Sequence, residues 1–172
     1  AEASGLPRVY PGDILRWYAK EDHTEIGEAA RKMFQENAYF PPLMLLEVMR
    51  RRFQEGDLSR GFILDGAFRT EVETKGYPEL LRASKLVMPV TVVALRIPGW
   101  MSVDRLVTGQ NARKRTDDTS TGVIRRLGHY YDSLGLRMKA MRENGWGIMH
   151  IRALQGPDEV YNNVLQALQS KR

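Results

Sequence analysis

Hydrophobic residues in the first third of the chain recur every three or four positions, the spacing of helices that are apolar on one face. The pattern predicts a short helix starting near Gly12, a second helix starting at Thr24, and a third helix from Pro41-Pro42 to about Gln54. Proline suits the start of a helix, where its missing N–H would have had no intrahelical partner. This part of the chain is therefore expected to be mainly helical.

Three apolar runs have the composition of buried strands. The clearest is the β-branched run Val90–Ile97, and shorter runs occupy Gly61–Asp65 and, more weakly, Gly147–Arg152. Further helices are predicted within 71–85, at about 101–107, at about 117–144, and from Pro157 to about residue 168. Strands separated by helices predict an α/β fold with a parallel sheet between two helical layers, here a three-layer α/β/α arrangement in a single domain of residues 1–172.

Composition excludes several classes of protein. The 172 residues are 42% hydrophobic and 27% charged, as in globular domains rather than disordered chains. No apolar run approaches the length of a membrane-spanning helix, and the first residues lack the basic and apolar regions of a signal peptide. The absence of cysteine excludes disulfides, thiol nucleophiles and thiolate metal sites. We expect a cytoplasmic monomer.

The charge balance favours arginine. The formal net charge is +5, and because seven of the 26 basic residues are lysine, the other 19 are arginine. The planar guanidinium group binds phosphate through two parallel hydrogen bonds, so this bias suits a protein that handles phosphorylated ligands or nucleic acid. Solvated helix faces explain the same composition equally well.

Two segments carry candidate chemistry. In the first, a predicted strand ends at Asp65, turns at Gly66 and then presents Arg69. Ligands of open α/β sheets bind beyond the carboxyl ends of strands, where these side chains would project. The second segment is rich in arginine, and its members could converge to stabilise a transferring phosphoryl group, or could form a nucleic-acid patch or a salt-bridged surface. It contains Arg105, Arg113, Lys114, Arg115, Arg125 and Arg126.

Taken together, these segments resemble the adenylate kinase family of nucleoside monophosphate kinases, over essentially the whole chain. The segment Gly5–Arg16 resembles the family's entry into its monophosphate-binding helices, and Gly61–Thr70 resembles its most recognisable signature. The segments Arg115–Asp118 and Ile124–Tyr130 resemble the return from the lid to the core. The resemblance implies a P-loop kinase fold with monophosphate-binding helices at 12–55 and a short lid at 107–116.

The resemblance also implies roles for matching residues. Arg16, Arg69 and Gly66 would bind the nucleoside monophosphate, and Asp65 would help to hold Mg²⁺ through water, as suits a cation that dehydrates reluctantly. Arg105 and Arg115 would bind ATP. Arg69, Arg115 and Arg126 would act in catalysis, and Asp117 with Asp118 would anchor the hinge of the lid. The implied reaction is reversible phosphoryl transfer from ATP to AMP or another nucleoside monophosphate.

Several departures from the family pattern qualify these roles. The motif G-x-x-x-x-G-K-[ST], which cradles phosphates in the family, does not occur in the sequence. We interpret the sequence as a truncated one, because residues 1–5 resemble the end of the helix that follows that motif. Pro11 replaces a threonine, Ala67-Phe68 replaces Phe-Pro, and Gly109-Gln110 stands where an additional arginine is expected.

Glu73 occupies the position of the glutamine that reads adenine in the family. An ionised carboxylate only accepts hydrogen bonds, so it would pair with the N–H groups of guanine rather than with adenine. The hypothesis is a shift from AMP toward GMP, and the alternative is a Glu73 side chain that rotates into solvent while AMP is retained. A second reading of the whole chain is a catalytically silent homologue that binds nucleotide or a protein partner. Nucleic-acid binding is a weaker candidate, because it rests on charge alone.

Overall fold

The computed structural model describes residues 4–36, 38–109 and 119–170. In the N-terminal half of the chain, short strands lie at the beginning of a helical segment and near its end. The elements are β1 (Arg8–Val9), α1 (Pro11–Glu21), α2 (Glu25–Glu36), α3 (Pro42–Phe53), β2 (Ile63–Leu64) and α4 (Glu71–Ala83). The helices predicted near Gly12, from Thr24, after Pro41 and within 71–85 are confirmed to within a few residues.

The C-terminal half contains longer strands and the longest helix. Its elements are β3 (Thr91–Arg96), α5 (Gly99–Val103), α6 (Ser120–Glu143), β4 (Gly147–Arg152) and α7 (Pro157–Gln169). The single helix predicted at about 101–107 is instead α5 followed by a π-helical segment, Asp104–Thr108, which ends where the Gly109 N–H donates to the Asp104 carbonyl. Of the helix predicted at about 117–144, residues 117 and 118 lie outside the described residues.

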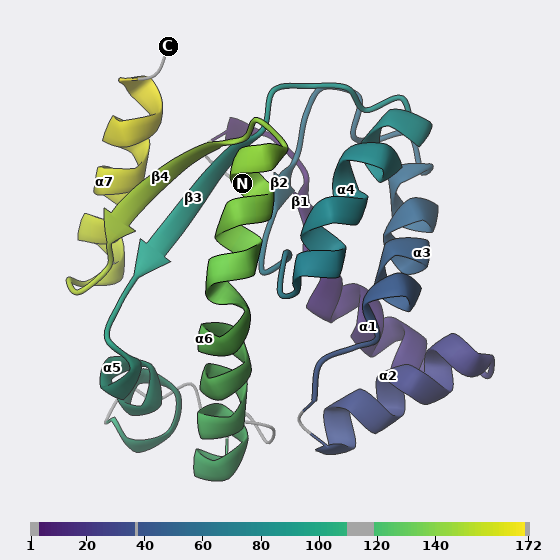
Figure 1. The fold of residues 1–172 in the computed structure, drawn as a ribbon, viewed down its shortest axis with the longest axis horizontal. Helices are drawn as coiled ribbons and strands as arrows, with labels where there is room; N and C mark the ends of the chain where they lie inside the picture. Colours follow the sequence, from purple (N-terminus) through teal and green to yellow (C-terminus); the bar gives the residue numbers. More distant parts are fainter. Residues whose placement is uncertain (1–3, 37, 110–118, 171–172) are drawn as a thin grey trace.

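The strands are parallel, as predicted, and among the described residues they form two separate pairs. β1 pairs with β2, with Arg8 opposite Ile63, and β3 pairs with β4, with Thr91 opposite Gly147. Figure 1 shows α6 crossing in front of the molecule between the β3–β4 pair and α4, while β1 and β2 lie behind it. Helices and parallel strands alternate along the chain, which confirms the α/β class.

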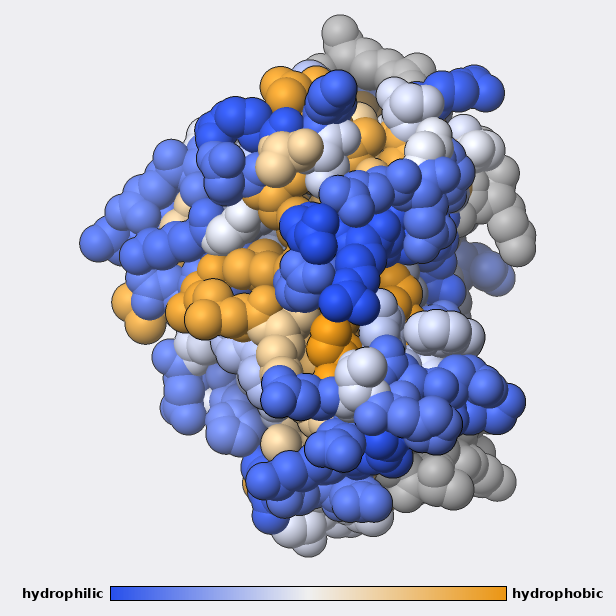
Figure 2. Space-filling model, turned by 90° about the vertical axis from the view of Figure 1, so that its right-hand side faces the viewer, coloured by the Kyte–Doolittle hydropathy of each residue, from blue (hydrophilic) through white to orange (hydrophobic). Residues whose placement is uncertain are grey.

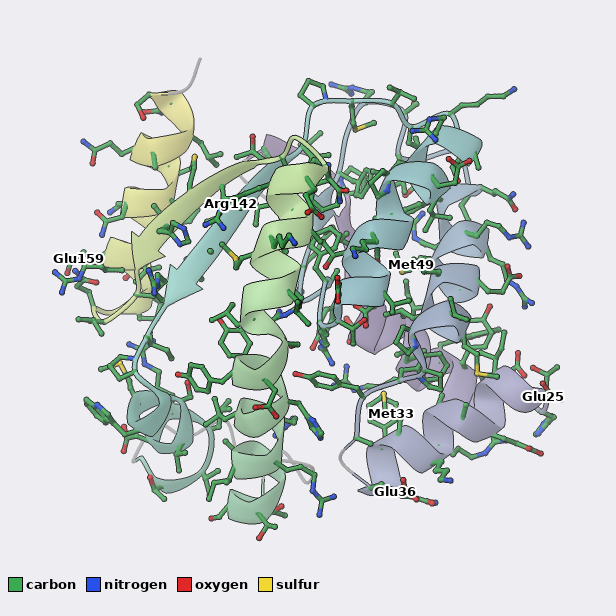
Figure 3. The ribbon with its side chains drawn as sticks, in the orientation of Figure 1. Glu25, Met33, Glu36, Met49, Arg142 and Glu159 are labelled. Atoms are coloured by element: carbon green, nitrogen blue, oxygen red, sulfur yellow. The ribbon has the colours of Figure 1, made fainter. Side chains whose placement is uncertain are left out.

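The main hydrophobic core belongs to the N-terminal half. Met49 of α3 and Tyr77 of α4 are completely buried, and Phe53 and Phe68 pack against the Tyr77 ring. In Figure 3 the Met49 side chain lies between α3 and α4, whereas Glu25 and Glu36 at the two ends of α2 point away from the interior. The outer face of these helices is mainly hydrophilic, with scattered hydrophobic side chains (Figure 2), of which Leu43 is the most exposed on α3.

Candidate functional site

A cavity of about 420 Å³ collects arginines from three separate parts of the chain. Arg16 comes from α1, Arg69 from the loop between β2 and α4, and Arg126 from α6, and all three line this cavity together with Gly66. These are three of the five arginines to which the resemblance gives a role, and a fourth, Arg115, lies outside the described residues. Their positions fit the rule that ligands bind beyond the carboxyl ends of parallel strands, because Gly66 and Arg69 directly follow β2.

The rest of the cavity wall is aromatic and apolar. Tyr10, Phe34, Tyr39 and Tyr130 line it, together with apolar side chains from several elements. The aliphatic and thioether members are Leu15, Met33, Ala38, Ala67, Leu106, Val123 and Leu127. A wall of this kind binds a flat, weakly polar ring, while the guanidinium groups bind anionic oxygens. The cavity therefore suits a ligand that combines an aromatic ring with phosphate.

The loop that carries Arg69 has an unusual backbone. Gly66 has φ +71°, a conformation that favours glycine, and a Cβ there would make a tight contact of 3.2 Å with the Tyr10 ring. Phe68 has φ +58°, a left-handed conformation that costs a bulky residue about 1–3 kcal/mol. The Arg69 Nε donates to the Gly66 carbonyl at 3.0 Å and closes the loop on itself. The shift of the aromatic residue to position 68 therefore coincides with a strained backbone immediately before Arg69.

The buried side chain of Glu73 holds this loop through a hydrogen bond to its backbone. Its side chain is 1% exposed, and its Oε2 accepts a hydrogen bond from the Arg69 backbone N–H at 2.8 Å. Thr70 caps α4, because its hydroxyl oxygen accepts a hydrogen bond from the Glu73 N–H. Burial raises the pKa of Glu73, against the opposing effect of the Arg69 N–H. The expectation that Glu73 could rotate into solvent is wrong, and Glu73 is not among the residues that line the cavity.

Arg16 is held at the opposite wall. Its Nη1 forms a 2.8 Å ion pair with Asp13, one turn earlier in α1. Its guanidinium carbon also lies 5.6 Å from the centre of the Phe34 ring and 5.9 Å from that of Tyr10. One of these contacts is to a carboxylate on the same helix, and the other two are to aromatic rings that line the cavity. Together they orient the half-buried Arg16 guanidinium at the cavity wall.

α6 supplies one further arginine to the cavity wall. Arg137 is only 7% exposed, and its two terminal nitrogens donate to the carbonyls of Phe68 and Tyr130, each at 2.9 Å. Its guanidinium carbon lies 4.7 Å from the centre of the Tyr130 ring. Burial lowers the pKa of Arg137 from its ordinary value. Arg137 stands in none of the motifs that the sequence offered.

A hydrogen bond joins two walls of the cavity near its edge. The Arg125 Nη1, on α6, donates to the Glu36 carbonyl at the end of α2, at 2.7 Å. The same two helices contribute Met33, Phe34, Val123 and Arg126 to the cavity. The contact therefore joins helices that lie far apart in the sequence and enclose the same space.

Asp65, the predicted magnesium ligand, lies at the end of β2 and is half exposed. Its Oδ2 accepts hydrogen bonds from Arg8 Nε at 2.9 Å and from Arg8 Nη2 at 2.6 Å. Among the described residues no group of three or more acidic or histidine side chains could hold a metal ion. One hard carboxylate beside the cavity fits Mg²⁺ held mainly by water and phosphate oxygens, the usual arrangement for this ion.

The remaining predicted residues contribute less to the cavity. Arg105 is exposed, and its Nη2 donates to the carbonyls of Leu154 and Gln155 at 3.1 and 3.2 Å, so it contacts the loop after β4 and not the cavity. Its neighbours Ser102 and Leu106 do line the cavity. Of the predicted lid, residues 110–116 lie outside the described residues, as do Asp117 and Asp118 of the predicted hinge.

Among the lining residues that sequence reasoning assigned no role at the site are Tyr10, Phe34, Tyr39, Tyr130 and Arg137. One signal was available for two of them. Arg126, Tyr130 and Arg137 are separated by four and seven positions, so they share one face of a helix. Tyr39 lies in the link between α2 and α3, where no periodicity operates. Tyr10 precedes α1, and its place in the cavity depends on the fold around it.

Comparison with known proteins gives consistent results. A family model described as "AAA domain" matches residues 1–125. The adenylate kinase of Leptospira biflexa serovar Patoc (strain Patoc 1 / Ames) is 29% identical over 167 residues, which cover 97% of this chain and 88% of that protein. The adenylate kinase of Kocuria rhizophila is 30% identical over 169 residues, and that of Mycobacterium sp. (strain MCS) is 27% identical over 168 residues, each covering 98% of this chain and 88% of the relative. In the part of the chain that is described, no helix is both long and apolar enough to cross a membrane.

Proposed function

Because the chain belongs to the AAA domain family and to the adenylate kinase family of nucleotide kinases, we propose that its cavity binds a nucleoside monophosphate as the acceptor of a phosphoryl group from ATP. AMP is the first acceptor to consider, since the relatives are named adenylate kinases. The proposed reaction is the reversible transfer of the γ-phosphoryl group, which yields two nucleoside diphosphates. No covalent intermediate with the protein is needed.

The observation that carries this proposal is the meeting of Arg16, Arg69 and Arg126 in one cavity with aromatic walls. Phosphoryl transfer depends mainly on positioning and on neutralising negative charge, and fixed guanidinium groups supply both. Arg16 and Arg69 would hold the monophosphate and orient its attacking oxygen. Arg126 would stabilise charge on the transferring group.

Of the two arginines expected to bind ATP, Arg105 and Arg115, only Arg105 is among the described residues. Arg105 and Arg115 would contact the triphosphate, Arg105 from the segment whose neighbours Ser102 and Leu106 line the cavity. Asp65 would hold Mg²⁺ through water, and the bound ion would neutralise phosphate charge. The motif G-x-x-x-x-G-K-[ST] does not occur in the 172 residues, so the proposed transfer also requires a phosphate-binding loop that these residues do not supply.

The choice of acceptor base belongs to this proposal as well. The buried carboxylate of Glu73 accepts a hydrogen bond from the Arg69 backbone N–H, which supports a structural role and removes the reason to expect GMP in place of AMP. Aromatic residues such as Phe34 and Tyr39 would contact the base by stacking, which does not by itself discriminate between bases, so the expectation of AMP comes from the relatives.

A coupled assay of diphosphate formation tests the proposal on the full-length protein. ATP is supplied with AMP, GMP, CMP or UMP in turn, and AMP is expected to give the highest kcat/KM. A preference for GMP would instead support the hypothesis that the Glu73 carboxylate pairs with the N–H groups of guanine. Binding of AMP without any turnover would instead identify a catalytically silent homologue, and no binding of any monophosphate would overturn the proposed site.

A further inference from the structure

One face of α6 lies along the loop that presents Arg69. Arg126, Tyr130, Ser133 and Arg137 are spaced by four, three and four residues, so they fall on a single face of the helix. Arg126, Tyr130 and Arg137 line the cavity, and the Ser133 hydroxyl oxygen lies 3.2 Å from the Arg69 carbonyl oxygen. Figure 1 shows α6 running past the end of β2, where this loop begins.

The contact between Arg137 and Phe68 is the most specific one on this face. The Arg137 Nη1 donates to the Phe68 carbonyl at 2.9 Å, while Nη2 donates to the Tyr130 carbonyl of its own helix. The guanidinium thus joins the loop to α6 through two backbone carbonyls. A planar group with two parallel donors fixes direction as well as distance.

The loop needs such an outside constraint. Phe68 adopts a left-handed backbone conformation that persists only when its surroundings hold it there. The Phe68 carbonyl belongs to the peptide unit whose N–H is that of Arg69. That N–H donates to Glu73, so both sides of this peptide unit are fixed, one by α4 and one by α6.

Arg137 is buried mainly against uncharged groups. Its Nε is buried without a hydrogen-bond partner, and burial lowers its pKa while the nearby Glu73 acts in the opposite direction. Burying a guanidinium group is unfavourable, and here the cost is offset by the hydrogen bonds to the Phe68 and Tyr130 carbonyls. The buried position of Arg137 is therefore linked to holding the Phe68 carbonyl.

We propose that Arg137 is a positioning residue: it fixes the Phe68–Arg69 peptide unit so that the Arg69 guanidinium faces the cavity and binds the phosphate of the nucleoside monophosphate. This inference rests on the proposed function, because it assigns Arg69 to phosphate. Arg137 acts through Arg69 and makes no contact with the reacting atoms. α6 then positions two guanidinium groups at once, its own Arg126 and, through Arg137, Arg69.

A double-mutant cycle on the full-length protein tests this role. AMP affinity is measured by titration calorimetry for the wild type, Arg69→Met, Arg137→Met and the double variant, together with KM and kcat. Arg137→Met is expected to weaken AMP binding about 10–100-fold, the range for a displaced positioning group. In the Arg69→Met background, the same substitution is expected to have almost no further effect.

Two further variants keep the test decisive. Arg142→Met removes an exposed arginine from the last turn of the same helix and is expected to leave AMP affinity unchanged. Arg137→Lys keeps the charge but cannot bridge two carbonyls with one planar group, so a partial loss is expected that again disappears without Arg69. If Arg137→Met does not fold, the lysine variant carries the cycle.

The outcomes separate this inference from the proposed function. Wild-type affinity in Arg137→Met, or an equal loss with and without Arg69, would overturn the positioning role. If Arg69→Met itself binds AMP normally, the phosphate role of Arg69 is wrong and the inference fails with it. Unfolding curves for each variant establish that affinity is compared between folded proteins.

Discussion

The two halves of the molecule contain similar elements but bury them very differently. Each half has a pair of parallel strands and several helices. In the N-terminal half a continuous core runs from Val9 to Leu86 and includes nearly every apolar face of α1, α3 and α4. Among the described residues of the C-terminal half, the buried hydrophobic side chains are Val123, Ala140, Met141, Met149 and Ala153.

The contrast also appears between β1 and β3. Val9 of the two-residue strand β1 is 1% exposed, because it belongs to the N-terminal core. β3 has six residues, but its side chains range from half buried to exposed, and Leu95 is 51% exposed. β3 pairs only with β4 among the described strands. The hydrophobic composition of a strand therefore does not by itself determine how deeply the strand is buried.

The cavity, unlike the core, draws on both halves of the molecule. The C-terminal half contributes little core, but its helix α6 contributes Arg126 and Arg137 to the cavity. The N-terminal half combines a continuous core with Arg16 and Arg69. A substitution in α6 should thus affect activity more than stability, whereas a substitution in the N-terminal core should do the reverse.

The largest expected effect is on catalysis. Arg126→Met in the full-length protein should lower kcat by about 10³–10⁵-fold, because an arginine that stabilises a transferring phosphoryl group contributes that much. The free energy of unfolding should change by less than about 0.5 kcal/mol, since the side chain is only half buried. Steady-state kinetics and urea unfolding measure the two quantities, with Arg142→Met as the control on the same helix. A large loss of stability with normal kcat would reverse the proposed division between the halves.

A matched pair of valine substitutions tests the core directly. Val48 of α3 is 1% exposed, so Val48→Ala should lower the free energy of unfolding by about 2 kcal/mol or more, from two lost methyl groups plus the space they leave. Val93 of β3 is only partly buried, and Val93→Ala should cost less than about 1 kcal/mol. Equal losses in urea unfolding would show that β3 is buried in solution as completely as the N-terminal core.

The smallest expected effect concerns the buried carboxylate of Glu73. Burial raises its folded-state pKa above the ordinary 4.5, so between these two values the unfolded chain binds fewer protons than the folded one. The wild type should therefore lose stability relative to Glu73→Gln as the pH rises from about 4.5 through the folded-state pKa. Unfolding of both proteins at several pH values measures this difference. If the wild type instead becomes more stable relative to Glu73→Gln as the pH rises, the folded protein stabilises Glu73 as an anion.

Much of the fold followed from the sequence because periodicity and end signals are local. The helix predicted after Pro41 is found at 42–53, and the last helix begins at Pro157 as predicted. The strand predicted at Val90–Ile97 is found at 91–96, but its predicted burial is wrong. Burial and the separation of the strands into two pairs depend on what lies beside each strand, which a local pattern does not contain.

The candidate site was predictable to the extent that its residues stand in recognisable motifs. Arg16, Gly66, Arg69 and Arg126 were assigned through such motifs, and they line one cavity. Arg105 was assigned in the same way, but its side chain binds the loop after β4. Arg137 has no motif, and its importance arises from a strained peptide unit 69 positions earlier, which only the three-dimensional structure reveals.

The hydrogen bond from Arg125 to the Glu36 carbonyl has a consequence for how α2 and α6 respond to pH. A main-chain carbonyl is not protonated near neutrality, so acidification that releases an arginine from a carboxylate would leave this contact intact. The junction between these two helices should therefore persist in mildly acidic solution, where ion pairs to aspartate and glutamate weaken.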